Sequence, residues 1–297
     1  MTLDSGLLLA LSVGLSSGRN IISKKTALGV SKKADFYFSQ TILFFSALVL
    51  ILLTGVWNFK ITSHLTVVYG IIYGVLLVLS QWMFTIALKT GNASICTVIY
   101  SLGFIFPTVI GAFVWDGGFT GILQPVGICL AVCTIVLSAF AKDKQVVNSA
   151  TPAQKKTTLT FFPFILVAML ASGGLGIMQK VQQKSVVSNE RDAFLIIAFI
   201  IATVCSLIFF LCYRQKPTLP KKQVVFTSAT GICFGGANVL NTVLAGLVSS
   251  AILFPVLNVS TILLSLILSL IVFSERLTLS KIGVVALSIA TVLAFSF

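Results

Sequence analysis

The chain has 297 residues, of which 57% are hydrophobic and only 9% are charged. A soluble domain usually carries about 25% charged residues, and a water-soluble fold of this size could not hide so much apolar surface. This composition excludes an ordinary soluble protein and indicates a protein embedded in lipid. The net charge of +13 does not indicate nucleic-acid binding, because the basic residues lie between apolar runs and none of their stretches resembles a recognition module.

The apolar runs are continuous and about 20 residues long, which suits membrane-spanning helices, and they lack the alternation of barrel strands. Helices also satisfy their backbone hydrogen bonds internally, as lipid requires. We therefore predict an all-α membrane protein with ten transmembrane helices. The predicted spans lie approximately at 7–23, 36–57, 65–88, 93–115, 122–140, 161–179, 193–213, 224–246, 250–273 and 281–297.

The longest polar segment lies at the midpoint of the chain, from Ala141 to Thr160, and is rich in Lys, Ser, Thr and Gln. Such a composition is typical of a linker. It divides the chain into a first five-helix repeat at 1–145, a linker at 146–160 and a second five-helix repeat at 161–297.

Short motifs recur in the same order on the two sides of this linker. They are Leu15-x-Ser17-Gly18 with Leu170-x-Ser172-Gly173, and Gly70-Ile71-x-Tyr73-Gly74 with Gly231-Ile232-x-Phe234-Gly235. Asp35 and Asp192 open the second and seventh predicted spans. An odd number of spans per half inserts the halves in opposite orientations, so we predict two inverted repeats, the plan of many secondary transporters.

The distribution of basic residues predicts which ends of the spans face the cytoplasm. Of the 20 Lys and Arg residues, all but Lys60, Lys180, Lys184 and Arg191 lie on the side that holds the loops after spans 1, 3, 5, 7 and 9. Cytoplasmic loops carry an excess of Lys and Arg. We therefore expect this basic side to be cytoplasmic and both termini to face outside.

Two hairpins carry a family pattern. The last hairpin reads Glu275-Arg276-Leu277-Thr278 followed by Gly283, and the first half has a weaker copy, Asp116-Gly117-Gly118 with Gly127. Three further features fit the same pattern: Asn92-Ala93-Ser94 before the fourth span, Pro107 inside it, and Ser249-Ser250-Ala251 with Pro255 at the ninth span. Over nearly its whole length the chain thus resembles the drug/metabolite transporter superfamily, in its ten-helix EamA-like branch. The first copy departs from the pattern, because Gly117 stands where the family usually has Arg.

The resemblance implies ten helices around a central cavity lined by the third, fourth, eighth and ninth spans. It implies transport of small organic metabolites or drugs by alternating access, as an exporter or a facilitator/exchanger. The expected partners are the lipid bilayer and a small-molecule substrate, with no nucleic acid, cofactor, metal site or catalytic residue. From the size and the lack of a targeting sequence we expect a multi-pass protein of a bacterial inner (plasma) membrane.

Two other functions stay open. One is an integral membrane enzyme, against which the chain shows no second histidine, no deep carboxylate pair and no nucleophile–base set. The other is a non-transporting membrane sensor or partner subunit, against which the internal repeat argues. Oligomeric state, substrate identity and transport direction have no signal in the sequence.

Polar side chains inside predicted spans are the candidates for substrate binding, because such groups are costly unless they face protein or water. The candidates are Gln81 and Trp82 in the third span, Tyr100 in the fourth, Asn238 and Asn241 in the eighth, Asn258 in the ninth, and Arg19 at the end of the first. Amides and hydroxyls can hydrogen-bond a solute while Trp and Tyr rings stack on its apolar part. Alternatively, the amides hold helices together and Arg19 extends to the lipid headgroups.

The remaining charged residues are expected to be shallow. Lys25 and Lys180 are predicted at the membrane interface, and Asp116 and Glu275 are predicted to have structural roles at hairpins. The acids nearest the spans are Asp35 and Asp192, and none is predicted near the middle of the membrane. Because proton-coupled carriers often place a carboxylate deep in the membrane, this pattern favours a facilitator or exchanger over a simple proton antiporter.

Overall fold

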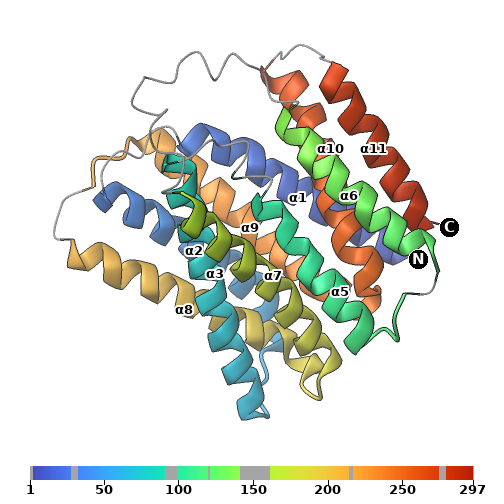
Figure 1. Cartoon of the computed structure of the whole chain (residues 1–297). Helices are drawn as coiled ribbons and strands as arrows, with labels where there is room; N and C mark the ends of the chain where they lie inside the picture. Colours follow the sequence, from blue (N-terminus) through green and yellow to red (C-terminus); the bar gives the residue numbers. More distant parts are fainter. Residues whose placement is uncertain are drawn as a thin grey trace. The chain divides into compact units, whose positions relative to one another are not determined.

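The computed structural model describes residues 3–27, 33–90, 96, 99–119, 121–140, 161–213, 217–273 and 279–296. These residues form α-helices, short 3-10 turns and a few non-helical residues (Figure 1). The predicted linker at 146–160, the motif Glu275–Thr278 and the segment Asn92–Ser94 lie outside the described residues.

The described α-helices are α1 (Leu3–Ala27), α2 (Lys33–Gly55), α3 (His64–Thr90), α5 (Ile105–Val114), α6 (Leu123–Phe140), α7 (Phe162–Lys184), α8 (Arg191–Cys212), α9 (Lys221–Leu247), α10 (Ser250–Phe273) and α11 (Leu279–Ser296). Short 3-10 turns are η1 (Val56–Asn58), η2 (Leu102–Phe104) and η5 (Ser188–Glu190). Within the described chain this confirms the predicted all-helical class.

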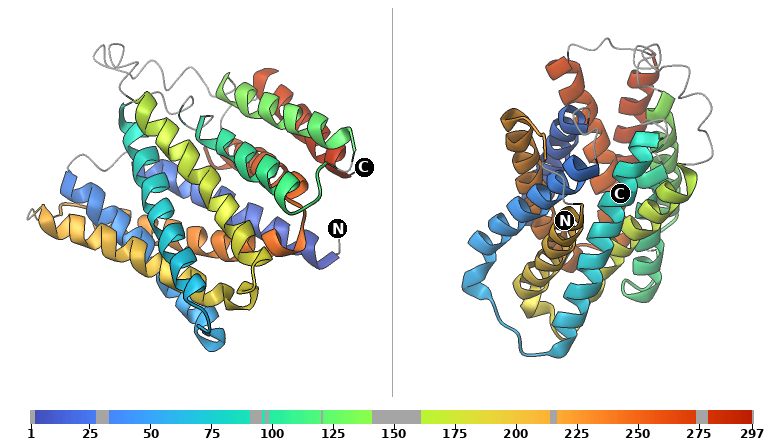
Figure 2. Two further views of the ribbon diagram at one scale, coloured as in Figure 1. Left: turned by 60° about the horizontal axis from the view of Figure 1, so that its bottom comes forward. Right: turned by 90° about the vertical axis from the view of Figure 1, so that its left-hand side faces the viewer.

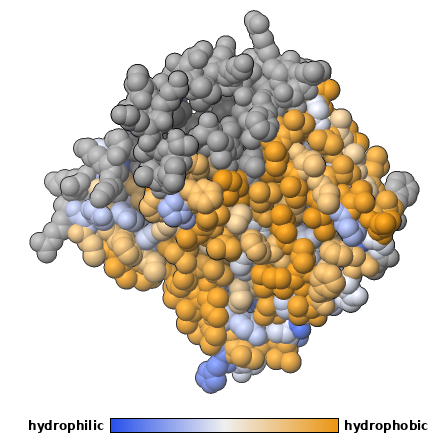
Figure 3. Space-filling model, viewed as in Figure 1, coloured by the Kyte–Doolittle hydropathy of each residue, from blue (hydrophilic) through white to orange (hydrophobic). Residues whose placement is uncertain are grey.

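Among the described residues, seven helices are long and apolar enough to cross a membrane. They coincide with the predicted spans 1, 2, 3, 6, 7, 8 and 9. The other three predicted spans fall on shorter apolar helices at Ile99–Val114, Leu123–Leu137 and Ile282–Ala294. Apolar side chains also cover most of the coloured face in Figure 3, as expected for a surface in contact with lipid chains. The fold is that expected of a multi-pass integral membrane protein.

The helices belong to two compact units, and each unit takes one segment from each half of the chain. Unit 1 comprises Met1–Val78 and Met178–Val248, and unit 2 comprises Leu79–Ile177 and Ser249–Phe297. The predicted repeats at 1–145 and 161–297 divide the sequence, whereas the compact units divide each of these halves again. Two of the three crossings between units lie inside the helices α3 and α7.

In unit 1, α1 packs along α9, and α2 packs against both α8 and α9. The approach of α9 to α2 depends on Gly231, because a Cβ atom there would lie 2.3 Å from the carbonyl oxygen of Leu43. The aromatic rings of Phe44, Phe199 and Phe234, one from each of these three helices, pack together beside this contact. A glycine and three rings thus fix the spacing of α2, α8 and α9.

Two buried carboxylates hold the ends of α2 and α8. Asp35, in the first turn of α2, accepts hydrogen bonds from the Thr218 amide at 2.7 Å and from its hydroxyl at 3.0 Å. Glu190, directly before α8, accepts a hydrogen bond from the Thr62 amide at 3.0 Å and from the hydroxyls of Thr62 and Thr66. Thr218 follows the C-terminus of α8, and Thr62 follows that of α2. The two helices therefore run antiparallel, and the acid beginning each one holds the loop that follows the other.

In unit 2, α10 packs against α5, α6 and α11, and α6 lies beside α11 (Figure 2). The N-terminal part of α7 approaches α5 through glycines. A Cβ atom at Gly173 would lie 2.7 Å from the Phe106 ring, and one at Gly176 would lie 2.7 Å from the Pro107 ring. These two glycines therefore allow α7 to approach α5 closely.

Candidate functional site

A buried chain of hydrogen bonds joins three helices of unit 1. Gln179 on α7 donates its side-chain amide to the Tyr73 hydroxyl at 2.8 Å, and this hydroxyl donates to Asn238 Oδ1 at 2.7 Å. Asn238 donates to the Phe234 carbonyl within α9. The Tyr73 side chain is fully buried, and Asn238 is only 7% exposed. The amide of Asn238, predicted to bind substrate, thus joins α9 to α3 and α7 in this structure.

Asn241 lies one turn further along α9 and contacts a different helix. Its Oδ1 accepts a hydrogen bond from the Ser12 hydroxyl of α1. Its amide nitrogen has no acceptor within the described part of the chain, and the side chain is half-buried. Asn241 therefore retains two N–H donors for a solute.

Arg19, the third predicted site residue of unit 1, lies near the C-terminal end of α1. Its guanidinium lies 4.1 Å from the centre of the Phe234 ring, which is a cation–π contact between α1 and α9. The side chain is half-buried within the protein. Packing on an aromatic ring is thus one function of Arg19 in this unit.

The other four predicted residues belong to unit 2. The Tyr100 hydroxyl is hydrogen-bonded to Ser80 at 2.9 Å, and the Tyr100 ring lies 4.3 Å from that of Phe84, between ring centres. Trp82 is buried, whereas Gln81 is half-buried on the same helix. The two contacts of Tyr100, with Ser80 and Phe84, hold α3 against the segment that precedes α5.

Asn258 lies on α10, three residues after Pro255. Its Nδ2 donates to the Phe254 carbonyl of its own helix at 2.9 Å. Its Oδ1 accepts no hydrogen bond from the described residues, and the side chain is half-buried. Asn258 thus offers a solute one acceptor oxygen.

Unit 1 holds three of the predicted residues, Arg19, Asn238 and Asn241, and unit 2 holds the other four, Gln81, Trp82, Tyr100 and Asn258. Asn238 and Asn241 lie on one helix but bind α3 and α1, respectively, and Gln81 and Trp82 are adjacent on α3. Five of the seven are half-buried, the exposure that a group lining a cavity requires, namely Arg19, Gln81, Tyr100, Asn241 and Asn258.

Lys180 is not interfacial as predicted. Its side chain is 1% exposed, and its Nζ donates to the Val248 carbonyl at 3.0 Å. Val248 follows the last turn of α9, where backbone carbonyls lack helical partners and favour a cation. The prediction was wrong because the sequence shows the depth of a residue along a span but not which face packs on a neighbouring helix. The Lys25 side chain lies outside the described residues.

Sequence reasoning also missed three polar residues of unit 1, Tyr73, Gln179 and Glu190. Tyr73 had an available signal, because its counterpart in the second repeat is Phe234, and the extra hydroxyl in an otherwise matching motif indicates a specific partner. Gln179 and Glu190 lie near span ends and had no such signal. All three are buried.

A half-open cavity of about 420 Å³ lies in unit 1, where α7, α8 and α9 meet. Its polar lining comes from Gln183, Ser188, Asn189, Arg191 and Asp192, and its other wall comes from the last turns of α9. Gly246 makes room for the Gln183 amide, since a Cβ atom there would lie 2.5 Å from Gln183 Oε1. This volume lies within the range of small-molecule sites.

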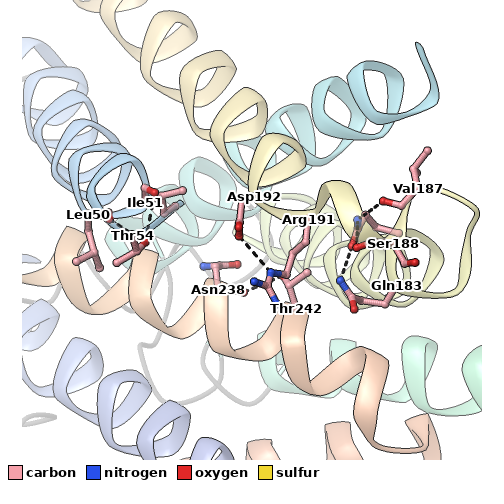
Figure 4. A network of polar contacts seen from close by, with 11 residues as sticks. Leu50, Ile51, Thr54, Gln183, Val187, Ser188, Arg191, Asp192, Asn238 and Thr242 are labelled. Carbon is pink, nitrogen blue, oxygen red and sulfur yellow. Dashed lines mark hydrogen bonds and ion pairs between the residues drawn. The ribbon is translucent and has the colours of Figure 1, made fainter. Parts of the chain in front are cut away.

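An ion pair forms one wall of the cavity. Arg191 Nε lies 3.2 Å from Asp192 Oδ1, and the Arg191 side chain is 33% exposed. Figure 4 shows the guanidinium extending from α8 toward Asn238 and Thr242 on α9. Its terminal Nη groups have no acceptor within the described residues. A planar guanidinium with free N–H groups suits a carboxylate or phosphate oxygen.

No family model matches the chain, and no curated protein is similar to it in sequence. Twenty-eight chains of solved structures resemble it in fold. One of them, a crystal structure of a protein, aligns over 99% of this chain and 96% of its own, with a TM-score of 0.76 and 14% sequence identity. At this identity the likeness shows that the two chains share a fold.

Proposed function

We propose that the protein is a membrane transporter that moves small organic solutes by alternating access, as an exporter or a facilitator/exchanger. The observation that carries the proposal is the reciprocal contact of α2 and α8, in which Asp35 holds Thr218 and Glu190 holds Thr62. The second span of the first half (α2) and its counterpart in the second half (α8) thus pack side by side in antiparallel orientation. Two halves inserted in opposite senses form the architecture that gives secondary transporters two equivalent access states.

The proposed membrane topology agrees with these contacts. Asp35 and Thr218 both fall on the side that is predicted to be cytoplasmic from its Lys and Arg content, and Glu190 and Thr62 both fall on the opposite side. The three shorter apolar helices complete ten spans in this proposal, five in each half. The similarity to the drug/metabolite transporter superfamily supports the same arrangement.

In unit 1, the proposed solute contacts are the Nη groups of Arg191 and the amide nitrogen of Asn241, which have no protein partner within the described residues. Arg191 favours a solute with an anionic group, and the Asn241 amide supplies neutral hydrogen bonds. In unit 2, Asn258 Oδ1 likewise accepts no hydrogen bond from the described residues. Asn238 and Trp82, both only 7% exposed, are too buried to be proposed as solute contacts.

The test begins with a thermal-shift screen of the purified protein against organic acids, amino acids, sugars and nucleotides. A solute that stabilises the protein is then measured by counterflow in proteoliposomes. Stabilisation and flux should be lost in Arg191→Gln. They should persist in the matched control Lys184→Gln, which removes the same charge from an exposed residue near the end of α7.

Three results would contradict the proposal. Solute binding without flux would support a membrane sensor, and chemical conversion of the solute would support a membrane enzyme. Flux that Arg191→Gln and Lys184→Gln reduce equally would remove the proposed role of the Arg191 guanidinium.

A further inference from the structure

The chain passes between the two units at three points, and only one of them is non-helical. The crossings at Val78–Leu79 and Ile177–Met178 lie inside α3 and α7, whereas the third joins Val248 to Ser249, between α9 and α10. A continuous helix resists sharp bending, but a residue at the end of an element can absorb large changes in φ and ψ. The third crossing is therefore the one of the three at which backbone dihedral angles can change without bending a helix.

Unit 1 holds the peptide group that precedes Ser249. The Val248 amide donates to the Leu244 carbonyl at 2.9 Å, which ends α9. The Val248 carbonyl accepts the hydrogen bond from buried Lys180 at 3.0 Å. Because a peptide group is planar, this bond fixes the whole Val248–Ser249 plane to unit 1.

Unit 2 holds the peptide group that follows Ser249. The Ser249 carbonyl accepts a hydrogen bond from the Leu253 amide at 2.9 Å, which starts α10. The Ser250 amide donates to Asp116 Oδ2 at 2.6 Å. The Ser249–Ser250 plane is therefore fixed to unit 2.

Close packing strengthens the hold of unit 2. Ser250 is fully buried, and its side chain occupies the space left by Gly111 on α5. A Cβ atom at Gly111 would lie 2.2 Å from Ser250 Oγ. The Ser249 amide has no acceptor in the described part of the chain. Only the two dihedral angles of Ser249 thus remain unrestrained between the two held planes.

We propose that Ser249 is a one-residue hinge between the two units and that Lys180 and Asp116 are the residues that position it. Each charged side chain fixes one peptide plane to its own unit, so rotation concentrates at the φ and ψ of Ser249. The hinge goes beyond the proposed function and rests on it only in assigning this rotation to alternating access.

Substitutions of Ser249 test the hinge directly. Spin labels at Asn189→Cys in unit 1 and Gly121→Cys in unit 2, both at exposed positions, report the distribution of distances between the units in a background without native cysteines. Ser249→Gly should broaden the distribution, because glycine frees φ. Ser249→Pro should narrow it, because proline fixes φ, and Val248 is already extended as a residue before proline must be (φ −119°, ψ 145°).

Ser249→Ala is the matched control, since it keeps ordinary backbone freedom and should leave the distribution unchanged. Equal distributions for the glycine, proline and alanine variants would overturn the proposal. If Ser249→Pro fails to fold, the glycine variant alone decides, because an unchanged distribution in it contradicts the hinge.

The two positioning residues have separate readouts. Asp116→Ala should accelerate hydrogen exchange of the Ser250 amide roughly tenfold, because a charge-assisted hydrogen bond is lost, and Asp116→Asn should accelerate it less, because an acceptor remains. Lys180→Met keeps the side chain long but removes its donor, and it should broaden the distance distribution. Unchanged exchange in Asp116→Ala and an unchanged distribution in Lys180→Met would contradict their roles. If the distance distributions change as expected but the protein shows no solute flux, the transporter proposal is wrong while the hinge proposal stands.

Discussion

The Tyr73 hydroxyl gives the sharpest test of the buried network in unit 1. Tyr73→Phe removes one oxygen atom that donates to Asn238 at 2.7 Å and accepts from Gln179 at 2.8 Å. The ring remains, and so does its packing against Phe194, whose ring centre is 4.9 Å away. Any loss of stability therefore reports the interactions of the hydroxyl group and not a cavity.

Side-chain hydrogen bonds between membrane helices contribute about 0.6 kcal/mol on average and up to about 1.7 kcal/mol. Two such bonds lost together, with both partners left buried, predict a decrease of roughly 1–3 kcal/mol in the free energy of unfolding. Titration of the protein from lipid–detergent micelles into sodium dodecyl sulfate measures this free energy. The matched control is Tyr69→Phe, one turn earlier on α3, whose hydroxyl makes no hydrogen bond within the described residues. Equal stability of the two variants would refute the network.

Three further predictions are tested by the same unfolding titration or by measuring solute flux in proteoliposomes. Gly231→Ala should lower the free energy of unfolding by about 1–3 kcal/mol, because the added Cβ atom would overpack against Leu43. Gly14→Ala is the control and should be neutral or stabilising, because no atom lies within 4 Å of a Cβ atom added there. Equal effects of the two substitutions would contradict the close contact of α2 with α9. Glu190→Ala should lower the free energy of unfolding by about 1–3 kcal/mol, because the Thr62 amide loses its acceptor. Glu190→Gln keeps one acceptor oxygen and should lose less stability than Glu190→Ala. Equal losses in the two variants would argue against the hydrogen bond as the cause. Flux of an identified solute should be independent of a pH gradient in the wild type and should stay so in Asp35→Asn and Asp192→Asn. A gradient-dependent flux in the wild type that becomes gradient-independent in either variant, with flux itself retained, would show proton coupling through a shallow acid.

The helical fold could be predicted because lipid imposes a length and an apolar composition on each span. The seven long helices coincide with predicted spans for this reason. Small residues were equally informative, since Gly173 and Gly176 lie where helices approach closely. The predicted span at 122–140 likewise coincides with α6 (Leu123–Phe140).

The partners of individual polar groups could not be predicted, because they depend on which helices pack together. Asn238 and Asn241 were identified as polar groups inside a span, yet only the structure shows that they bind Tyr73 and Ser12, respectively. Lys180 was misplaced for the same reason, since its acceptor is a carbonyl 68 residues away in sequence. Arg191, which forms a wall of the cavity, was counted only as a loop charge.

The insertion of the two halves in opposite senses is tested most directly by labelling Lys60→Cys and Lys221→Cys in a background without native cysteines. Both residues are exposed, and they occupy corresponding places, just before the third and the eighth predicted spans. In vesicles of known orientation, a membrane-impermeant maleimide should react with Lys60→Cys only from outside and with Lys221→Cys only from the cytoplasmic side. Reaction of both cysteines from one side would contradict the inverted repeat and, with it, the alternating-access proposal.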